Sequence, residues 1–111
     1  MDKINKVTIV GGTHGNEFSG IYLLKKWQDQ QSLISRRSFT TETLFANPKA
    51  YQENKRYINC DLNRQFSLVK LANANPESHE QNLAQKINKQ LGPKGKAKTD
   101  FIIDLHNTTS N

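Results

Sequence analysis

Apolar residues gather in a few short runs of an otherwise polar chain, and three of these runs predict strands. Residues 7–10 are rich in β-branched side chains and end at a Gly-Gly pair, which predicts a buried central strand of a parallel or mixed sheet. Residues 39–46 predict a second strand, because threonines favour extended structure and the following Asn-Pro pair ends it. Residues 101–105 predict a third buried strand.

A helical repeat follows the first strand. Leu23, Leu24 and Trp27 stand three, four and seven residues after Gly20. This spacing predicts a helix whose apolar stripe covers the sheet. Asn16 is the predicted N-cap of this helix.

A second helix is predicted between residues 75 and 91. Its start is indicated by the sequence Asn-Pro-Glu at residues 75–77 and its end by Gly92. His79 lies on the early, polar part of this helix, so we expect it to face solvent. The apolar positions recur every four residues: Leu83, Ile87 and Leu91.

This alternation of strands and helices predicts an α/β fold with a mixed, largely parallel sheet and flanking helices. If the helix before residues 101–105 is a crossover, this strand runs parallel to residues 7–10 and lies next to it or nearly so. Ligands of such sheets bind at the carboxyl ends of the strands, where the loops converge. We therefore expect the functional site at that edge.

Composition restricts the class of protein. A chain of 111 residues, 34% of them hydrophobic, is enough for one small domain. Cys60 is the only cysteine, so an intrachain disulfide is excluded. The first residues carry no apolar stretch long enough for a signal peptide or a membrane span. We expect a cytoplasmic protein with no membrane partner.

The net charge favours an anionic partner. Sixteen Lys and Arg residues against ten Asp and Glu residues give +6, which attracts a nucleic acid or a small dianion alike. Part of the excess lies in residues 94–98, a lysine-rich tract that predicts a solvated loop. The charge alone does not choose between the two partners.

The glycine-rich turn, residues 11–17, carries the first candidate chemistry. His14 and Glu17 stand three residues apart, which places an imidazole and a carboxylate on one side, able to share a metal ion. The alternative is a surface histidine followed by an acid that favours the start of a helix. The glycines of the turn would let the backbone bend sharply and come close to a bound ion or substrate.

A third ligand candidate follows the last strand. If the strands are parallel neighbours, His106 reaches the same edge as His14. Imidazoles more than about 8 Å apart would exclude a shared zinc ion, given Zn–N bonds of about 2.0–2.1 Å. Asp104 shares a strand face with His106, so it would orient the imidazole without touching the metal. Pairing with an arginine or capping a helix is an equally good interpretation of Asp104.

The densest polar segment is residues 56–66, here called the arginine loop. Arginines, asparagines and an aspartate alternate there with apolar residues. This pattern is compatible with an RNA-contacting loop. It is equally compatible with guanidinium groups that meet carboxylates.

Several of these segments together resemble a known family. The motifs are GGTHGNE at residues 11–17, NP at 47–48, RYINCDLNR at 56–64, GPK at 92–94 and DLHNTTSN at 104–111. In this order they closely resemble the amino-terminal part of the aspartoacylase and succinylglutamate desuccinylase branch of the zinc carboxypeptidase-like hydrolases. The resemblance runs through nearly the whole chain.

The resemblance implies a metal centre. It implies the zinc carboxypeptidase-like fold and one zinc ion per chain, bound by His14, Glu17 and His106. Three protein ligands leave a fourth position for water, whose pKa the metal lowers.

The resemblance also implies how a substrate binds. Arg56 is implied to be catalytic, because it binds and polarises the scissile carbonyl. Asn63 and Arg64 are implied to hold the α-carboxylate of the amino acid. The implied activity is hydrolysis of an N-acyl-L-aspartate, above all N-acetyl-L-aspartate, to a carboxylate and L-aspartate. The partner would then be a small molecule and not a nucleic acid.

No residue matches the glutamate that serves the family as general base. We therefore expect residues 1–111 to be the amino-terminal part of a hydrolase domain whose carboxy-terminal part is absent. Such a piece is expected to be inactive alone and only marginally stable. It is also expected to form homo-oligomers, because a shortened sheet exposes an unpaired edge and apolar surface.

Two other functions stay open. A deacylase of another N-acyl acidic amino acid, such as N-succinylglutamate, would use the same residues. The charge of +6 and the arginine loop also suit a non-catalytic, basic nucleic-acid-binding module. Such a module needs no histidine and glutamate paired with a distant histidine.

Overall fold

The computed structural model describes residues 3–92 and 98–107. The predicted lysine-rich loop therefore lies outside the described residues except for Lys98. The same holds for residues 108–111 of the last motif.

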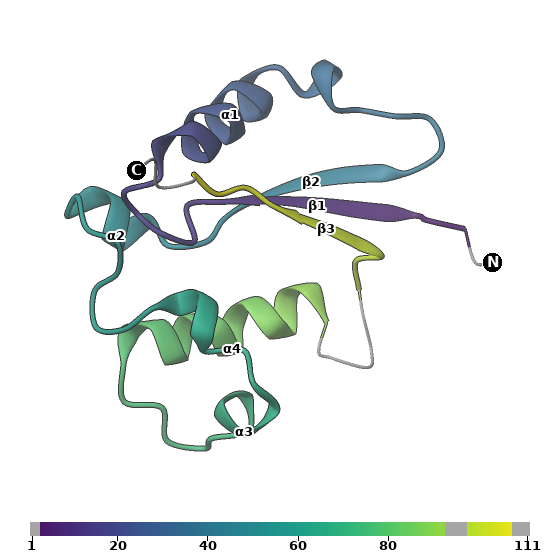
Figure 1. Ribbon diagram of the computed structural model, residues 1–111. Coiled ribbons are helices and arrows are strands. Elements are labelled where there is room, and N and C mark those ends of the chain that lie inside the picture. Colours follow the sequence, from purple (N-terminus) through teal and green to yellow (C-terminus); the bar gives the residue numbers. More distant parts are fainter. Residues whose placement is uncertain (1–2, 93–97, 108–111) are drawn as a thin grey trace.

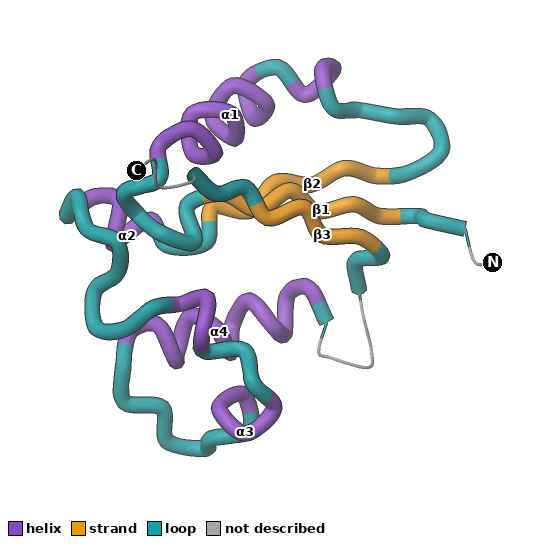
Figure 2. Tube along the Cα trace, viewed as in Figure 1, coloured by secondary structure: helices purple, strands orange, loops and turns teal. Residues whose placement is uncertain are grey.

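The first predicted strand is the centre of a three-stranded parallel sheet (Figures 1 and 2). The strands are β1 (Lys6–Gly11), β2 (Thr40–Phe45) and β3 (Phe101–Asp104), in the order β2-β1-β3. Val10 of β1 pairs with Leu44 on one side and with Asp104 on the other. The predicted strands are confirmed, and β1 and β3 are neighbours. The described strands are all parallel, so a mixed sheet is not seen in this part of the chain.

Helices cover both faces of the sheet, as Figure 1 shows. One face carries α1 (Phe18–Asp29), and the other carries α4 (His79–Leu91), on which the short α3 (Leu68–Leu71) packs. Beyond the carboxyl ends of the strands lies α2 (Pro48–Gln52). Two single-turn 3-10 helices complete the described elements: η1 (Gln31–Leu33) and η2 (Leu62–Arg64). No described helix is both long and apolar enough to cross a membrane.

The core follows from the alternation of side chains along β1. Val10 faces α4 and packs in a buried cluster with Leu62, Ala84 and Ile87. Gly11, one residue on, faces Leu24 of α1 instead. The central strand is thus buried on both faces, as its continuous apolar sequence predicted.

The predicted details of α1 are partly wrong. Its N-cap is Glu17 and not Asn16, and the Glu17 side chain makes no capping hydrogen bond. Its buried residues are Gly20, Ile21 and Leu24, while Leu23 is 39% exposed. The buried stripe is therefore rotated from the predicted one, and Gly20 packs closely against Leu105. A Cβ on Gly20 would lie 2.9 Å from the Cβ of Leu105.

The second helix ends where predicted and starts later. Gly92 is its C-cap, but its N-cap is Ser78, whose hydroxyl accepts the N–H of Gln81. The predicted cap, Asn75, instead lies in the loop before the helix. The start is set by tertiary contacts as well as by the cap, because the side chain of Asn59 accepts the N–H of His79.

The prediction of a buried third strand is wrong for the described chain. Phe101, Ile102 and Ile103 are 51%, 48% and 39% exposed. The reason is that β3 is an edge strand, which the helices on either face only partly cover. Self-association through this edge stays a prediction.

Candidate metal centre

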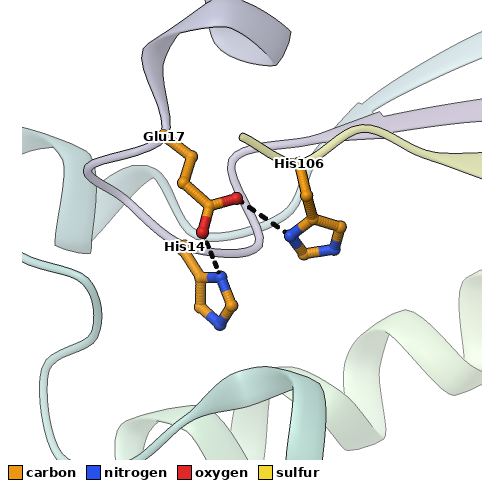
Figure 3. Close-up of side chains that lie close together, drawn as sticks. All are labelled: His14, Glu17 and His106. Carbon is orange, nitrogen blue, oxygen red and sulfur yellow. Dashed lines mark hydrogen bonds and ion pairs between the residues drawn. The ribbon is translucent and has the colours of Figure 1, made fainter. Parts of the chain in front are cut away.

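The candidate ligands meet at the carboxyl edge of the sheet. The glycine-rich turn leaves β1 and places His14, whose side chain is 5% exposed, directly before α1. His106 follows β3 by two residues. Because β1 and β3 are parallel neighbours, His14 and His106 lie close together although they are 92 positions apart in the sequence (Figure 3).

The carboxylate of Glu17 lies between the two imidazoles. Its Oε2 is 2.6 Å from His14 Nδ1, and its Oε1 is 2.9 Å from His106 Nδ1. The two ring centroids are 5.2 Å apart. This distance confirms the predicted approach of the imidazoles to within about 8 Å, the range in which they can share one ion.

A carboxylate stands behind each imidazole. His14 Nε2 is 2.9 Å from Asp61 Oδ1, and His106 Nε2 is 2.9 Å from Asp104 Oδ2. The hydroxyl of Thr13 donates to the other oxygen of Asp104 at 3.0 Å. Metal-binding histidines usually donate their second N–H to such an acceptor, which fixes the ring and its tautomer. Both Nδ1 atoms are thereby directed at the same point.

The contacts of Asp104 agree with one of its two interpretations, which stays a prediction. Within the described residues it caps no helix and pairs with no arginine. It contacts His106 and Thr13 instead. This is the arrangement in which Asp104 orients an imidazole from behind.

Hydrogen bonding sets the charges at the centre. Burial alone would raise the pKa of Glu17, but the hydrogen bond from the N–H of Asn107 and the contacts with both imidazoles lower the pKa below its ordinary value. Burial would likewise raise the pKa of Asp61, and its contacts with His14, the N–H of Asn63 and Arg56 lower it. Glu17 and Asp61 are therefore ionised at neutral pH.

The donor set suits a zinc ion. One atom each from His14, Glu17 and His106 lie within 4.8 Å of one another. Two imidazole nitrogens and one carboxylate oxygen form a common three-ligand set for catalytic zinc. Among the described residues this is the group of histidine and acidic side chains gathered closely enough to hold a metal.

The arginine loop borders the centre. Arg56 Nη1 is 3.4 Å from Glu17 Oε2, and its Nη2 is 3.8 Å from Asp61 Oδ2. The Arg56 carbonyl accepts the N–H of Gly15 at 3.0 Å, so the loop also holds the glycine-rich turn. The structure therefore agrees with a guanidinium that meets carboxylates, the second of the two interpretations of this segment.

Asn63 and Arg64 lie on η2, beside the centre. Asn63 lines a cavity of about 320 Å³ together with Thr13 and Asp104, and the other walls of the cavity are mostly apolar. Arg64 is exposed and forms no ion pair with any residue that the structure describes. Arg56 and Asn63 are thus brought to the centre, whereas Arg64 stays outside its hydrogen-bond network.

Comparison with known proteins places this arrangement in a family. Residues 3–111 match the model of the succinylglutamate desuccinylase/aspartoacylase catalytic domain. The chain belongs to this family.

Two relatives and one solved structure show how far the likeness extends. The chain is 57% identical over 111 residues to a probable aspartoacylase of Trichodesmium erythraeum. This alignment covers all of this chain and 38% of the relative. It is 47% identical over 110 residues to an N-acyl-aromatic-L-amino acid amidohydrolase (carboxylate-forming) of Xenopus tropicalis, and this alignment covers 97% of this chain and 35% of the relative. The crystal structure of murine aminoacylase 3 superposes with a TM-score of 0.89 at 40% identity, covering 97% of this chain and 37% of that one. The chain therefore spans little more than a third of these relatives.

Sequence reasoning missed two acidic residues near the centre. Asp61 stands in the arginine loop, and no spacing rule connects it to His14, 47 residues earlier. Glu80 is fully buried in the first turn of α4 and contacts the same loop. The available signal was its position, because Glu80 shares a helix face with the buried residues Ala84 and Ile87.

His79 was also interpreted wrongly. Its ring is half-buried, and its Nε2 is 3.0 Å from Asn47 Oδ1. It faces inward because Asn47 is itself held by Glu80, which accepts the Asn47 side-chain N–H at 3.0 Å. His79 lies outside the group of candidate metal ligands.

Glu80 predicts a loss of stability in acid. Burial would raise its pKa, but three backbone N–H groups and the Asn47 amide lower the pKa below the ordinary value of 4.5. Its stabilisation is therefore complete above pH 4.5 and is lost as the pH falls toward the folded-state pKa. The free energy of unfolding, measured with urea, should fall by up to about 1.4 kcal/mol per pH unit from this carboxyl alone. In Glu80→Gln this share of the slope should disappear, and an unchanged slope would contradict the assignment.

Proposed function

We propose that this chain forms the metal-binding part of a zinc-dependent amidohydrolase that removes the acyl group from an N-acyl-L-aspartate, with N-acetyl-L-aspartate as the substrate. The observation that carries the proposal is the cluster of His14, Glu17 and His106, with a carboxylate behind each imidazole. Its support is the family, whose named relatives are aspartoacylases and other amidohydrolases.

The protein groups would prepare the site for zinc. Asp61 and Asp104 accept hydrogen bonds from the outer imidazole nitrogens, so both inner nitrogens offer lone pairs to one point. Glu17 adds a negative charge there, and the N–H of Asn107 fixes its carboxylate. When bound, zinc supplies Lewis-acid activation of the amide carbonyl and a water of lowered pKa.

Arg56 would stabilise the charge that develops on the substrate. Its guanidinium already lies beside Glu17 at 3.4 Å and is 46% exposed, so it can turn toward a bound carbonyl oxygen. Fixed positive charge next to a developing oxyanion lowers the barrier without further reorganisation. Asn63 and Arg64 would bind the α-carboxylate, for which the planar guanidinium of arginine is well suited. The general base would come from the part of the relatives that this chain does not cover.

A second substrate class is favoured by two observations. A relative at 47% identity acts, by its name, on N-acyl-aromatic amino acids. The cavity beside Asn63 has largely apolar walls, which suit an aromatic side chain better than a carboxylate. The net charge of +6 favours the acidic substrates instead.

A chimera tests the proposal. In it, this chain replaces the matching amino-terminal part of the Trichodesmium relative, to which it is 57% identical. Three substrates are compared with the zinc-loaded protein: N-acetyl-L-aspartate, N-succinyl-L-glutamate and N-acetyl-L-phenylalanine. We expect aspartate release by the chimera and almost none by the 111-residue chain, because a positioned acid or base contributes about 10²–10⁴ in rate. A folded, zinc-loaded chimera that hydrolyses none of the three would contradict the proposal.

Arg64→Lys in the chimera should raise KM about tenfold or more and leave the zinc content unchanged. A single ammonium cannot replace a planar group that grips a carboxylate in two places. The matched control is Arg37→Lys, since Arg37 lies before the amino end of β2, opposite to the site. Loss of zinc from the Arg64 variant would show that this arginine belongs to the metal centre.

A further inference from the structure

The carboxylate of Glu80 binds three successive backbone N–H groups of the arginine loop. Oε1 accepts from Asn59 at 2.8 Å and from Cys60 at 3.1 Å, and Oε2 accepts from Ile58 at 2.8 Å. The Asn47 side chain donates to Oε2 as well. Each oxygen therefore accepts two hydrogen bonds. The Glu80 side chain is fully buried, and charge-assisted hydrogen bonds are strong in such surroundings.

The loop holds the helix in return. Asn59 Oδ1 accepts the backbone N–H of His79 at 2.8 Å, and Cys60 Sγ lies 3.3 Å from Ser78 Oγ. Glu80 also stands in the first turn of α4, where the positive end of the helix dipole favours a negative charge. Residues 58–60 and the start of α4 are therefore locked together from both sides.

Both flanks of this locked segment contact the glycine-rich turn. On one side the Arg56 carbonyl accepts the N–H of Gly15 at 3.0 Å. On the other side Asp61 Oδ1 lies 2.9 Å from His14 Nε2. The position of residues 58–60 therefore determines where the support of His14 stands.

We propose that Glu80 is a positioning residue of the metal centre, which holds residues 58–60 so that Asp61 meets the His14 imidazole and Arg56 meets Glu17. The inference rests on the proposed function in one respect, that His14, Glu17 and His106 bind zinc. Glu80 does not touch these ligands. It acts on them through Asp61 and Arg56.

Glu80→Gln tests the proposal with little change of shape. The new amide NH₂ group must take the place of Oε1 or of Oε2. It then faces the backbone N–H groups of Asn59 and Cys60 or that of Ile58, which it cannot accept, so these hydrogen bonds to the loop are lost. We expect the zinc affinity of the 111-residue chain, measured with Zn²⁺ against a competing chelator, to fall about 10- to 100-fold, the range for lost support of a ligand. The matched control, Glu77→Gln, removes the same charge from an exposed residue just before α4 and should change the affinity less than twofold.

A double-variant cycle separates positioning from general stability. If Glu80 acts through Asp61, its substitution should cost much less zinc affinity in an Asp61→Asn background than in the unaltered chain. Equal losses in both backgrounds would overturn this route.

Hydrogen exchange tests the same coupling without any substitution, and so does not depend on folding of a variant. Coupling between two sites is reciprocal. Zinc binding should therefore slow exchange of the Ile58, Asn59 and Cys60 amides about tenfold. The Lys70 amide, which Ser67 caps in α3, should not respond and serves as the reference.

The outcomes distinguish this inference from the proposed function. If the unaltered chain binds no zinc, the proposed function fails and the inference fails with it. If it binds one zinc, but Glu80→Gln binds equally tightly or the three amides do not respond, the inference alone is overturned.

Discussion

His106→Ala should lower the zinc affinity of this chain by at least about 100-fold, and His14→Ala should do the same. Loss of a carboxylate that merely supports a ligand already costs 10- to 100-fold, and here a ligand itself is lost. Glu17 would be left with a single imidazole and could not complete a three-ligand site. Titration with Zn²⁺ in competition with a chelator measures the change.

The third histidine is a natural control. The chain has three histidines, and His79 contacts Asn47 instead of the metal centre. His79→Ala should therefore keep one zinc per chain with an affinity within a fewfold of the original. A site that survives loss of His106 but not of His79 would refute the ligand set.

Gly15→Ala should destabilise the fold by about 3 kcal/mol, at the upper end of the usual cost of overpacking. A Cβ on Gly15 would lie 2.5 Å from the backbone nitrogen of Tyr51 and against the backbone of Ala50 and Lys55. Backbone atoms cannot turn aside as a side chain does, so α2 would have to move away from the turn. Thermal unfolding should show a midpoint lowered by on the order of 10–20 °C.

Gly11→Ala is the matched comparison. Its Cβ would lie 2.7 Å from Cδ1 of Leu24, which can adjust its rotamer, and 3.0 Å from the Gly20 carbonyl oxygen, a looser backbone contact than those at Gly15. We expect a cost of about 1 kcal/mol. If both variants were equally destabilised, the backbone contact at Gly15 would not be the cause.

The glycines illustrate what a sequence can and cannot reveal. The turn and its sharp bend were predictable, and Gly12 does have a positive φ of 73°. A close approach of the glycine backbone to an ion or a substrate stays a prediction. The close approach of Gly15 to the protein's own α2 was not predicted, because only tertiary structure decides which backbone lies nearby.

The meeting of His14 and His106 at the carboxyl ends of the strands was predictable from local signals. A β-branched run ending in glycines identified β1, and a histidine just after an apolar run identified the partner of His14. Parallel pairing then required the two imidazoles to meet. Burial was not predictable in the same way, since Phe101 is apolar yet 51% exposed on an edge strand.

Helix starts and buried charges depended on distant contacts. Asn75 and Ser78 are equally good caps by their chemistry, and the contact between Asn59 and His79 favours the later one. Glu80 meets partners 20 or more residues away in the chain, which no periodicity encodes. Its place on an apolar helix face was the one local sign.

The pairing of β1 with β3 has a consequence for how the protein is made. Val7 pairs in register with Phe101, far along the sequence, so β1 gains this neighbour only after all the residues between them have been synthesised. Contacts of such long sequence separation form slowly, and a nascent chain leaves the ribosome with its central strand unpaired on one side. Until residue 106 emerges, the growing polypeptide holds His14 and Glu17 without their third partner. Tight uptake of zinc would therefore have to wait until His106 has been synthesised and β3 has paired with β1.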